Sequence, residues 1–158
     1  MKIHDENIVP KYLKMLDELS RTHVEIGIIG DGDKYKGTDI TVLGVATIHE
    51  YGLNVVDKNG RKINIPERSF IRSSYDANKQ KIFEFDKELE RVLGLELSVD
   101  GFFNLVGEFA VGVIQNHLTS QVKSPPLAAS TIKAKGSSNP LIDTGQLRRS
   151  IDDKIVRS

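Results

Sequence analysis

Residues 99–118 read VDGFFNLVGEFAVGVIQNHL, a segment long enough and apolar enough to form a central helix. Apolar side chains recur along it at helical spacing, so one stripe of the helix should face a core. The members of that stripe are Phe102, Val106, Phe109 and Val113. The segment also carries Gly101, Gly107 and Gly112, each of which weakens a helix by ~1 kcal/mol relative to alanine. We therefore expect another backbone to approach this helix closely.

A second long amphipathic helix is expected over residues 76–93, upstream of this segment, with Gly94 at its end. Its apolar positions, spaced by three and four, are Ile82, Phe85, Leu89 and Val92. Shorter helices are expected from Pro10 onward, over residues 40–51, over residues 127–135, and before Arg149 with Asp143 or Thr144 as the cap.

Strands are expected near residues 23–30, 54–57, 61–65 and 151–157, where β-branched residues are frequent. Asn59 and Gly60 supply the positive φ values that a tight hairpin turn requires. The chain shows no internal repeat and no long linker. The sequence thus predicts one α+β domain over residues 1–158, in which a small, mostly antiparallel sheet packs against two long helices.

The composition excludes several classes of protein. The 158 residues include 22 basic and 22 acidic side chains, so the net charge is zero and a globally basic DNA coat is excluded. Cysteine is absent, which removes disulfide frameworks and thiolate chemistry. The opening residues MKIHDENIVPKYLKML do not resemble a signal peptide, and no apolar run is long enough to span a bilayer.

A search for catalytic and metal-binding motifs finds no convincing site. His49 and Glu50 begin a zinc-protease pattern, but Leu53 stands where the second histidine is needed. Residues 27–32 do not fit a dinucleotide-binding loop, and residues 143–145 match an aspartic-protease triplet only in three letters. We expect no catalytic residues, no metal site and no cofactor.

Several basic residues could form a local phosphate-binding face, which makes a DNA-binding accessory protein the main alternative. Neighbouring acids favour a solvated surface of mixed charge instead. The basic residues are Arg68, Arg72, Lys79, Lys81, Arg148 and Arg149.

Five ordered blocks carry a resemblance to a known family. They are VEIGI at 24–28, IHEYG at 48–52, IPERSFIR at 65–72, PPLAASTIKAKG at 125–136 and PLIDTGQLRRSI at 140–151. Together they resemble the phage virion morphogenesis and tail-completion proteins, which are neck or minor tail components of tailed bacteriophages and prophages.

The resemblance implies a structural protein without catalysis that acts in tail completion or head–tail joining. It implies a homo-oligomeric ring in the virion, a hexamer by family analogy, although the isolated protein could remain a monomer. Its partners would be other neck or tail proteins and the packaged DNA that passes through the ring, with no membrane. A small hydrolase centred on His49 and Glu50 is the least favoured alternative.

Within that resemblance, the motif blocks need roles in folding or in subunit contact. His49, Glu50 and Tyr51 can hydrogen-bond across to residues 65–72, with Gly52 allowing the reversal of the chain. The polar loops 31–39 and 136–139 are suited to partner contact. The complete set of motif residues is His49, Glu50, Tyr51, Gly52, Pro66, Arg68, Phe70, Ile71, Arg72, Pro125, Pro126, Leu127, Asp143, Thr144, Gly145, Leu147 and Arg148.

Overall fold

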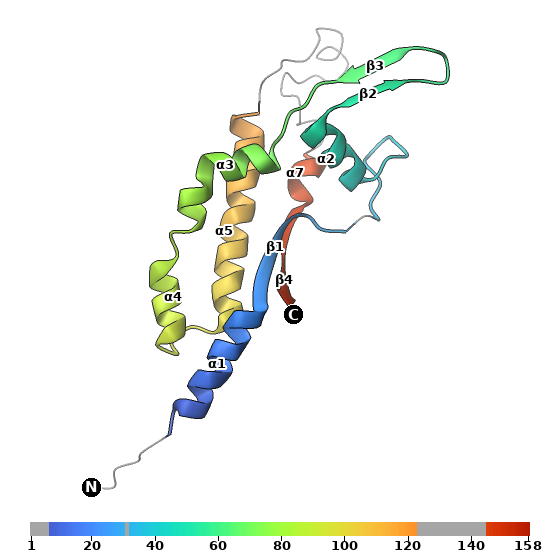
Figure 1. Ribbon diagram of the computed structural model, residues 1–158. Helices are drawn as coiled ribbons and strands as arrows, with labels where there is room; N and C mark the ends of the chain where they lie inside the picture. The colour runs from blue at the N-terminus through green and yellow to red at the C-terminus, as the bar shows by residue number, and fades with distance from the viewer. Residues whose placement is uncertain (1–6, 31, 123–144) are drawn as a thin grey trace, which may run out of the picture.

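A computed structural model describes residues 7–30, 32–122 and 145–158 (Figure 1). In chain order, the elements are α1 (Val9–Arg21), β1 (Thr22–Ile28), α2 (Val42–Tyr51), β2 (Leu53–Val56), β3 (Lys62–Ile65), α3 (Ile71–Ile82), α4 (Asp86–Leu93), α5 (Val99–Ser120), α7 (Gln146–Arg149) and β4 (Ile151–Arg157). The predicted α+β class is confirmed, because helices pack on a small antiparallel sheet.

The central sheet joins the two ends of the described chain. β1 and β4 pair antiparallel, with Val24 opposite Ile155 and Ile28 opposite Ile151. Side chains alternate between the two faces of a strand, so these four residues share one face, which α5 covers. In Figure 1, α3 and α4 lie on one side of α5, while β1 and β4 lie on the other.

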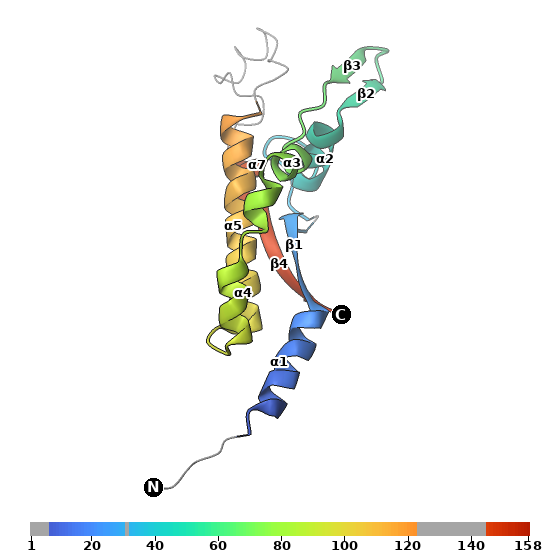
Figure 2. The same ribbon diagram turned by 60° about the vertical axis from the view of Figure 1, so that its left-hand side comes forward.

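The predicted strands do not form one sheet. Instead, β2 and β3 form a separate antiparallel hairpin. Figure 2 shows this hairpin and α1 at opposite ends of the molecule. The predicted tight turn is also wrong in detail, because only Gly60 has a positive φ (+77°) and the loop spans residues 57–61. A hydrogen bond of 2.9 Å from Asp57 N to Arg61 O closes the loop.

The helix expected over residues 76–93 is wrong, because two helices occupy this region. α3 begins earlier, at Ile71, and ends at Ile82, and α4 begins at Asp86. At the break, the Phe85 ring packs nearly perpendicular to the rings of Phe102 and Phe109, with centroid distances of 6.4 and 5.5 Å. Because no proline or glycine interrupts the segment, we attribute the break to this aromatic packing against α5.

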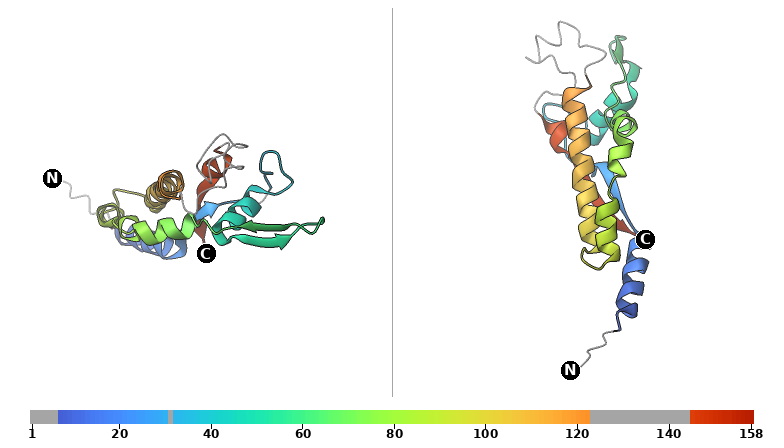
Figure 3. Two further views of the ribbon diagram at one scale, coloured as in Figure 1. Left: turned by 90° about the horizontal axis from the view of Figure 1, so that it is seen from above. Right: turned by 90° about the vertical axis from the view of Figure 1, so that its left-hand side faces the viewer.

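Helix α5 is present as predicted, but its buried stripe is not the expected one. The buried positions are Val99, Gly107, Ala110, Ile114 and Leu118. By contrast, Phe109 is 40% exposed. Gly107 therefore faces β4, whereas Phe109 packs against Phe85, just before α4. Figure 3 shows α4 beside α5.

Close approach by a side chain of β4 explains one of the three glycines of α5. A Cβ on Gly107 would lie within 3.0 Å of the Asp153 Cβ on β4. Gly112, by contrast, has nothing within 4 Å of its Cβ position. β4 thus approaches Gly107 closely, but through the Asp153 side chain, so the expected approach of another backbone is wrong in detail at Gly107 and wrong for Gly112.

Two groups of buried side chains hold the elements together. The larger links α2, α5, α7 and β4 through Val42, Ala46, Phe70, Ile114, Leu118, Val122, Leu147 and Ile151. The smaller links α1 and α4 to the start of α5 through Met15, Val92 and Val99. No helix among the described residues is long and apolar enough to cross a membrane.

Candidate functional site

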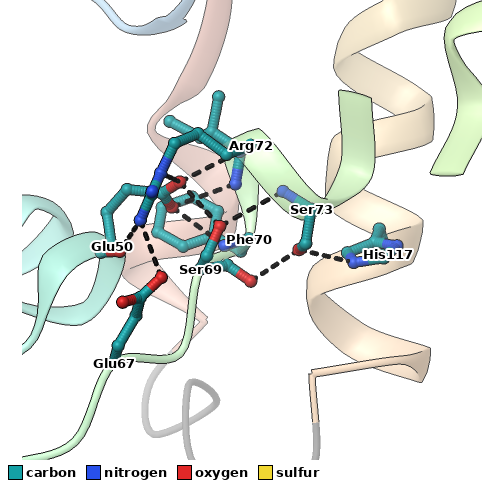
Figure 4. Close-up of polar contacts among 8 residues, drawn as sticks. Glu50, Glu67, Ser69, Phe70, Arg72, Ser73 and His117 are labelled. Atoms are coloured by element: carbon teal, nitrogen blue, oxygen red, sulfur yellow. Dashed lines mark hydrogen bonds and ion pairs between the residues drawn. The ribbon is translucent and has the colours of Figure 1, made fainter. Parts of the chain in front are cut away.

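The carboxylate of Glu50 binds the N-terminus of α3. It lies in the last turn of α2 and accepts hydrogen bonds from the backbone amides of Phe70, Ile71 and Arg72 at 2.8, 3.1 and 2.9 Å. Ser69 Oγ and Arg72 Nε add two more, at 2.8 and 3.1 Å (Figure 4). A carboxylate suits this place because the first amides of a helix have no partner within the helix.

Arg72 completes the contact between the two motif blocks. Its Nη2 donates to the backbone carbonyl of Glu50 at 2.5 Å and to Glu67 Oε1 at 2.8 Å. The guanidinium also lies over the Tyr51 ring, 4.6 Å from the centroid. The predicted contact between residues 48–52 and 65–72 is therefore confirmed, although Tyr51 takes part through its ring. We call Glu50, Ser69, Arg72 and the amides of Phe70 and Ile71 the Glu50 clamp.

The surroundings of Glu50 and Arg72 favour the charged form of both side chains. Burial raises the pKa of Glu50, but the hydrogen bonds from the Arg72, Phe70 and Ile71 amides outweigh burial and lower that pKa below 4.5. Burial lowers the pKa of Arg72, but its hydrogen bond to Glu50 and the charge of Glu67 raise that pKa overall. Both groups are thus ionised at neutral pH.

Gly52 lets the chain leave α2 directly toward the hairpin. Its φ of +74° with a ψ of 171° is not the left-handed helical conformation, but it is one that glycine adopts far more readily than other residues. A Cβ there would lie 3.0 Å from both Ile65 O and Glu67 N. A bond of 2.8 Å from Arg68 N to His49 O holds the returning chain against α2.

A hydrogen-bonded pair that the sequence did not indicate links the clamp to α5. Ser73 Oγ lies 2.9 Å from His117 Nε2 and donates to Ser69 O at 2.6 Å. Burial lowers the pKa of His117, which favours the neutral imidazole. Residues 44 positions apart carry no local spacing signal, so only the packing of α3 on α5 could reveal this pair.

The remaining motif residues fall into three groups. Phe70 and Leu147 are core residues, at 0% and 1% exposure, and Pro66 and Ile71 are half-buried. Gly145 occupies the cap position of α7 with a φ of +72°, where Asp143 or Thr144 was expected. Outside the described residues lie Pro125, Pro126, Leu127, Asp143, Thr144, the helix expected over 127–135 and the loop 136–139.

The basic residues do not form one free phosphate-binding face. Arg68 is buried, and burial lowers its pKa. Arg72 is held by Glu50 and Glu67, whereas Arg148 and Arg149 are exposed on α7. Arg68 and Arg72, two of the six basic residues of the predicted face, are therefore not available to a phosphate.

Within residues 7–30, 32–122 and 145–158, no group of three or more histidines and acids could hold a metal ion. Comparisons with known protein families, with curated proteins and with solved structures each found no match to this chain.

Proposed function

We propose that this chain is a structural virion protein of a tailed phage or prophage, which acts in tail completion or head–tail joining by assembling as a ring. The Glu50 clamp is the observation that carries the proposal. It ties together the IHEYG and IPERSFIR blocks on which the family resemblance partly rests, and it sets where the hairpin between them begins. The two motif blocks thus have a structural role, because they hold α2 against the start of α3.

The same geometry argues against the hydrolase alternative. A general base needs a carboxylate lone pair that faces a substrate proton, but both oxygens of Glu50 accept bonds from the fold itself. The Ser73 hydroxyl is likewise engaged with the Ser69 carbonyl. The Glu50 carboxylate and the Ser73 hydroxyl therefore both serve the fold through their hydrogen bonds.

Exposed apolar side chains support a protein that contacts other subunits. Tyr75 and Phe83 are 47% and 69% exposed, and they line two hollows that share Ile26 and Ile82. Large apolar groups that gather on a surface mark contact sites in soluble proteins. The DNA-binding alternative receives less support, because Arg68 is buried and Arg72 is paired.

Deletion of the gene from the phage or prophage tests the proposal. We expect filled heads and tails that fail to join, or tails of abnormal length, when lysates are viewed by electron microscopy. A plasmid copy of the gene should restore joined particles, and a labelled copy should appear at the neck or the tail end. Normal infectious particles from the deletion would overturn the proposal, and strong salt-sensitive DNA binding by the isolated protein would favour the alternative.

A further inference from the structure

Strand β1 has an outer edge that no other strand of the described chain covers. The central sheet contains only β1 and β4, which lie side by side (Figure 1). An edge strand presents backbone N–H and C=O groups to which a further strand can bond. The residues that direct these groups outward decide what the edge can bind.

The amide of Asp153 identifies the outward groups. It donates to Asp152 Oδ1 at 3.0 Å, which leaves it outside the ladder to β1. Asp153 lies opposite Ile26, and in an antiparallel pair the bonded residue pairs alternate with pairs whose backbone groups point away from each other. Ile26, and Val24 two positions earlier, therefore direct N–H and C=O away from β4. Within the part of the chain that the structure describes, these outward groups have no hydrogen-bond partner.

Two largely apolar hollows adjoin the same two residues. Val24 and Ile26 line a hollow of about 390 Å³, and Ile26 also lines one of about 500 Å³. Both residues are half-buried. The other apolar walls include Ile82, which both hollows share, and Tyr75, Phe83, Phe102 and Ile114.

The outward backbone groups and the hollows together fit an added strand. An antiparallel strand alongside β1 would bond to Val24 and Ile26 through its backbone. Its residues opposite these two would turn their side chains to the same face of the sheet. Alternate side chains of a strand lie about 7 Å apart, which is also the spacing of Val24 and Ile26. One side chain could therefore enter each hollow.

The open part of this edge ends at Gly27. Gly27 is buried, and the Ile71 side chain lies 4.0 Å from its Cβ position. An added strand would therefore pair with the part of β1 that precedes Gly27.

The two edges of the sheet differ in their protection. On β4, the Asp152 carboxylate occupies the outward amide of Asp153, and the charged side chain of Asp153 lies on the face that α5 covers. Charged side chains of this kind keep other strands from pairing with an edge. β1 contains no proline, lysine or arginine, and its residues on the covered face are uncharged. β1 is thus the edge that remains open to pairing.

We propose that β1 binds an extended segment of a different protein, which adds as a strand at its outer edge and places apolar side chains in the two hollows. Main-chain bonds would supply the affinity, and the hollows would select apolar residues at alternate positions. A second copy of this chain fits less well, because the outward residues of β4 include Asp153, whose carboxylate would enter an apolar hollow. The inference goes beyond the proposed virion role and holds whichever protein supplies the segment.

A short synthetic peptide tests the proposal on the wild-type protein. In this peptide, valine and isoleucine alternate with threonine between terminal lysines, and fluorescence anisotropy measures its binding. N-methylation of two apolar residues removes N–H groups that face β1 and should weaken binding by about tenfold or more. N-methylation of two threonines, whose N–H groups face away, is the matched control and should change the affinity by about twofold or less.

Amide hydrogen exchange followed by NMR reports on the edge itself. The amides of Val24 and Ile26 should exchange rapidly in the isolated protein and become protected when the peptide binds. The amide of Glu25, which belongs to the ladder with β4, is the internal control and should be protected in both states.

A proline substitution provides an independent arm. Val24→Pro removes an outward N–H, a place where edge strands tolerate proline, so peptide binding should be lost while the melting temperature changes little. Ile155→Pro makes the same change on the outer edge of β4 and should bind the peptide normally. If Val24→Pro fails to fold, the methylated peptides on the wild-type protein still decide the question.

Three results would overturn the proposal. The first is equal affinity for the two methylated peptides, which would mean apolar binding without strand pairing. The second is the absence of peptide binding up to about 1 mM. The third is concentration-dependent protection of Val24 and Ile26 in the protein alone, which would mean that a second copy fills the edge. Normal particles from the gene deletion would not bear on any of these measurements, so the two proposals fail independently.

Discussion

Glu50 is the residue on which the joint between α2 and α3 depends. Its carboxylate accepts five hydrogen bonds, and the residue is only 5% exposed. Glu50→Gln replaces one acceptor oxygen with an NH₂ group that faces N–H donors. We expect the free energy of unfolding in urea to fall by about 3 kcal/mol, since breaking a buried charged contact leaves its partners unsatisfied.

Glu67→Gln is the matched control for this prediction. Glu67 contacts the same guanidinium, but its side chain is 55% exposed, so its loss should cost about 0.5 kcal/mol or less. Equal effects of the two substitutions would contradict the assigned role of Glu50. Because the pKa of Glu50 is lowered, its contribution is complete above its ordinary value of 4.5 and is lost as the pH falls through the folded-state pKa.

The raised pKa of Asp153 predicts a pH dependence of stability with the opposite sign to that of Glu50. It lies on the sheet face covered by α5, where burial, Asp152 and Glu108 raise its pKa above 3.8. Because this pKa is raised, the folded state binds the proton of Asp153 more tightly than the unfolded state does. The free energy of unfolding therefore falls as the pH rises from the ordinary value of 3.8 through the folded-state pKa of Asp153.

Asp153→Asn should therefore raise the melting temperature at about pH 7, and the gain should shrink toward about pH 3, where the wild-type carboxyl is protonated. Glu108→Gln should give a smaller gain of the same sign, because it removes only one of the causes. A gain that is constant with pH would contradict this assignment.

Residue types alone could anticipate part of this chemistry. The contact of residues 48–52 with residues 65–72 was predictable, because the two blocks flank a hairpin and must return close to each other. The burial of Arg68 and the position of Asp153 were not, because each depends on packing between elements far apart in the chain.

At the scale of elements, the glycines of α5 provide a sensitive test of packing. Alanine favours a helix over glycine by about 1 kcal/mol, so Gly112→Ala, where the surface is open, should stabilise the protein by about that amount. Gly107→Ala should instead destabilise it by about 1–2 kcal/mol, because the new methyl group would push Asp153 and β4 away.

Chemical denaturation of the two variants measures both effects. Combining Gly107→Ala with Asp153→Ala should recover most of the loss, because the obstructing side chain is then shorter. If Gly112→Ala destabilised the protein as much as Gly107→Ala, the surface at Gly112 would not be open as described.

Periodicity predicted most elements but not their limits or their partners. α5 lies where its long apolar repeat put it, and β4 lies where its short alternating pattern put it. The break between α3 and α4 was hidden, since the apolar positions keep helical spacing across it. Tertiary contacts of Phe85 with α5 override local helix propensity there.

For the molecule as a whole, the structure separates the buried cores from the β2–β3 hairpin. The buried side chains of both core groups lie outside the β2–β3 hairpin, and the Glu50 clamp fixes the chain on either side of it. This division could not be inferred from the sequence, which predicted one sheet containing all four strands. The correct pairing of β1 with β4 joins residues more than 120 positions apart, beyond any local pattern.

Replacing residues 54–64 with a short glycine–serine linker should therefore leave the rest of the protein folded. We expect the far-ultraviolet circular dichroism and melting temperature to remain close to those of the wild type, since no residue of either core group is removed. Loss of the fold on excision would place the hairpin within the folding unit.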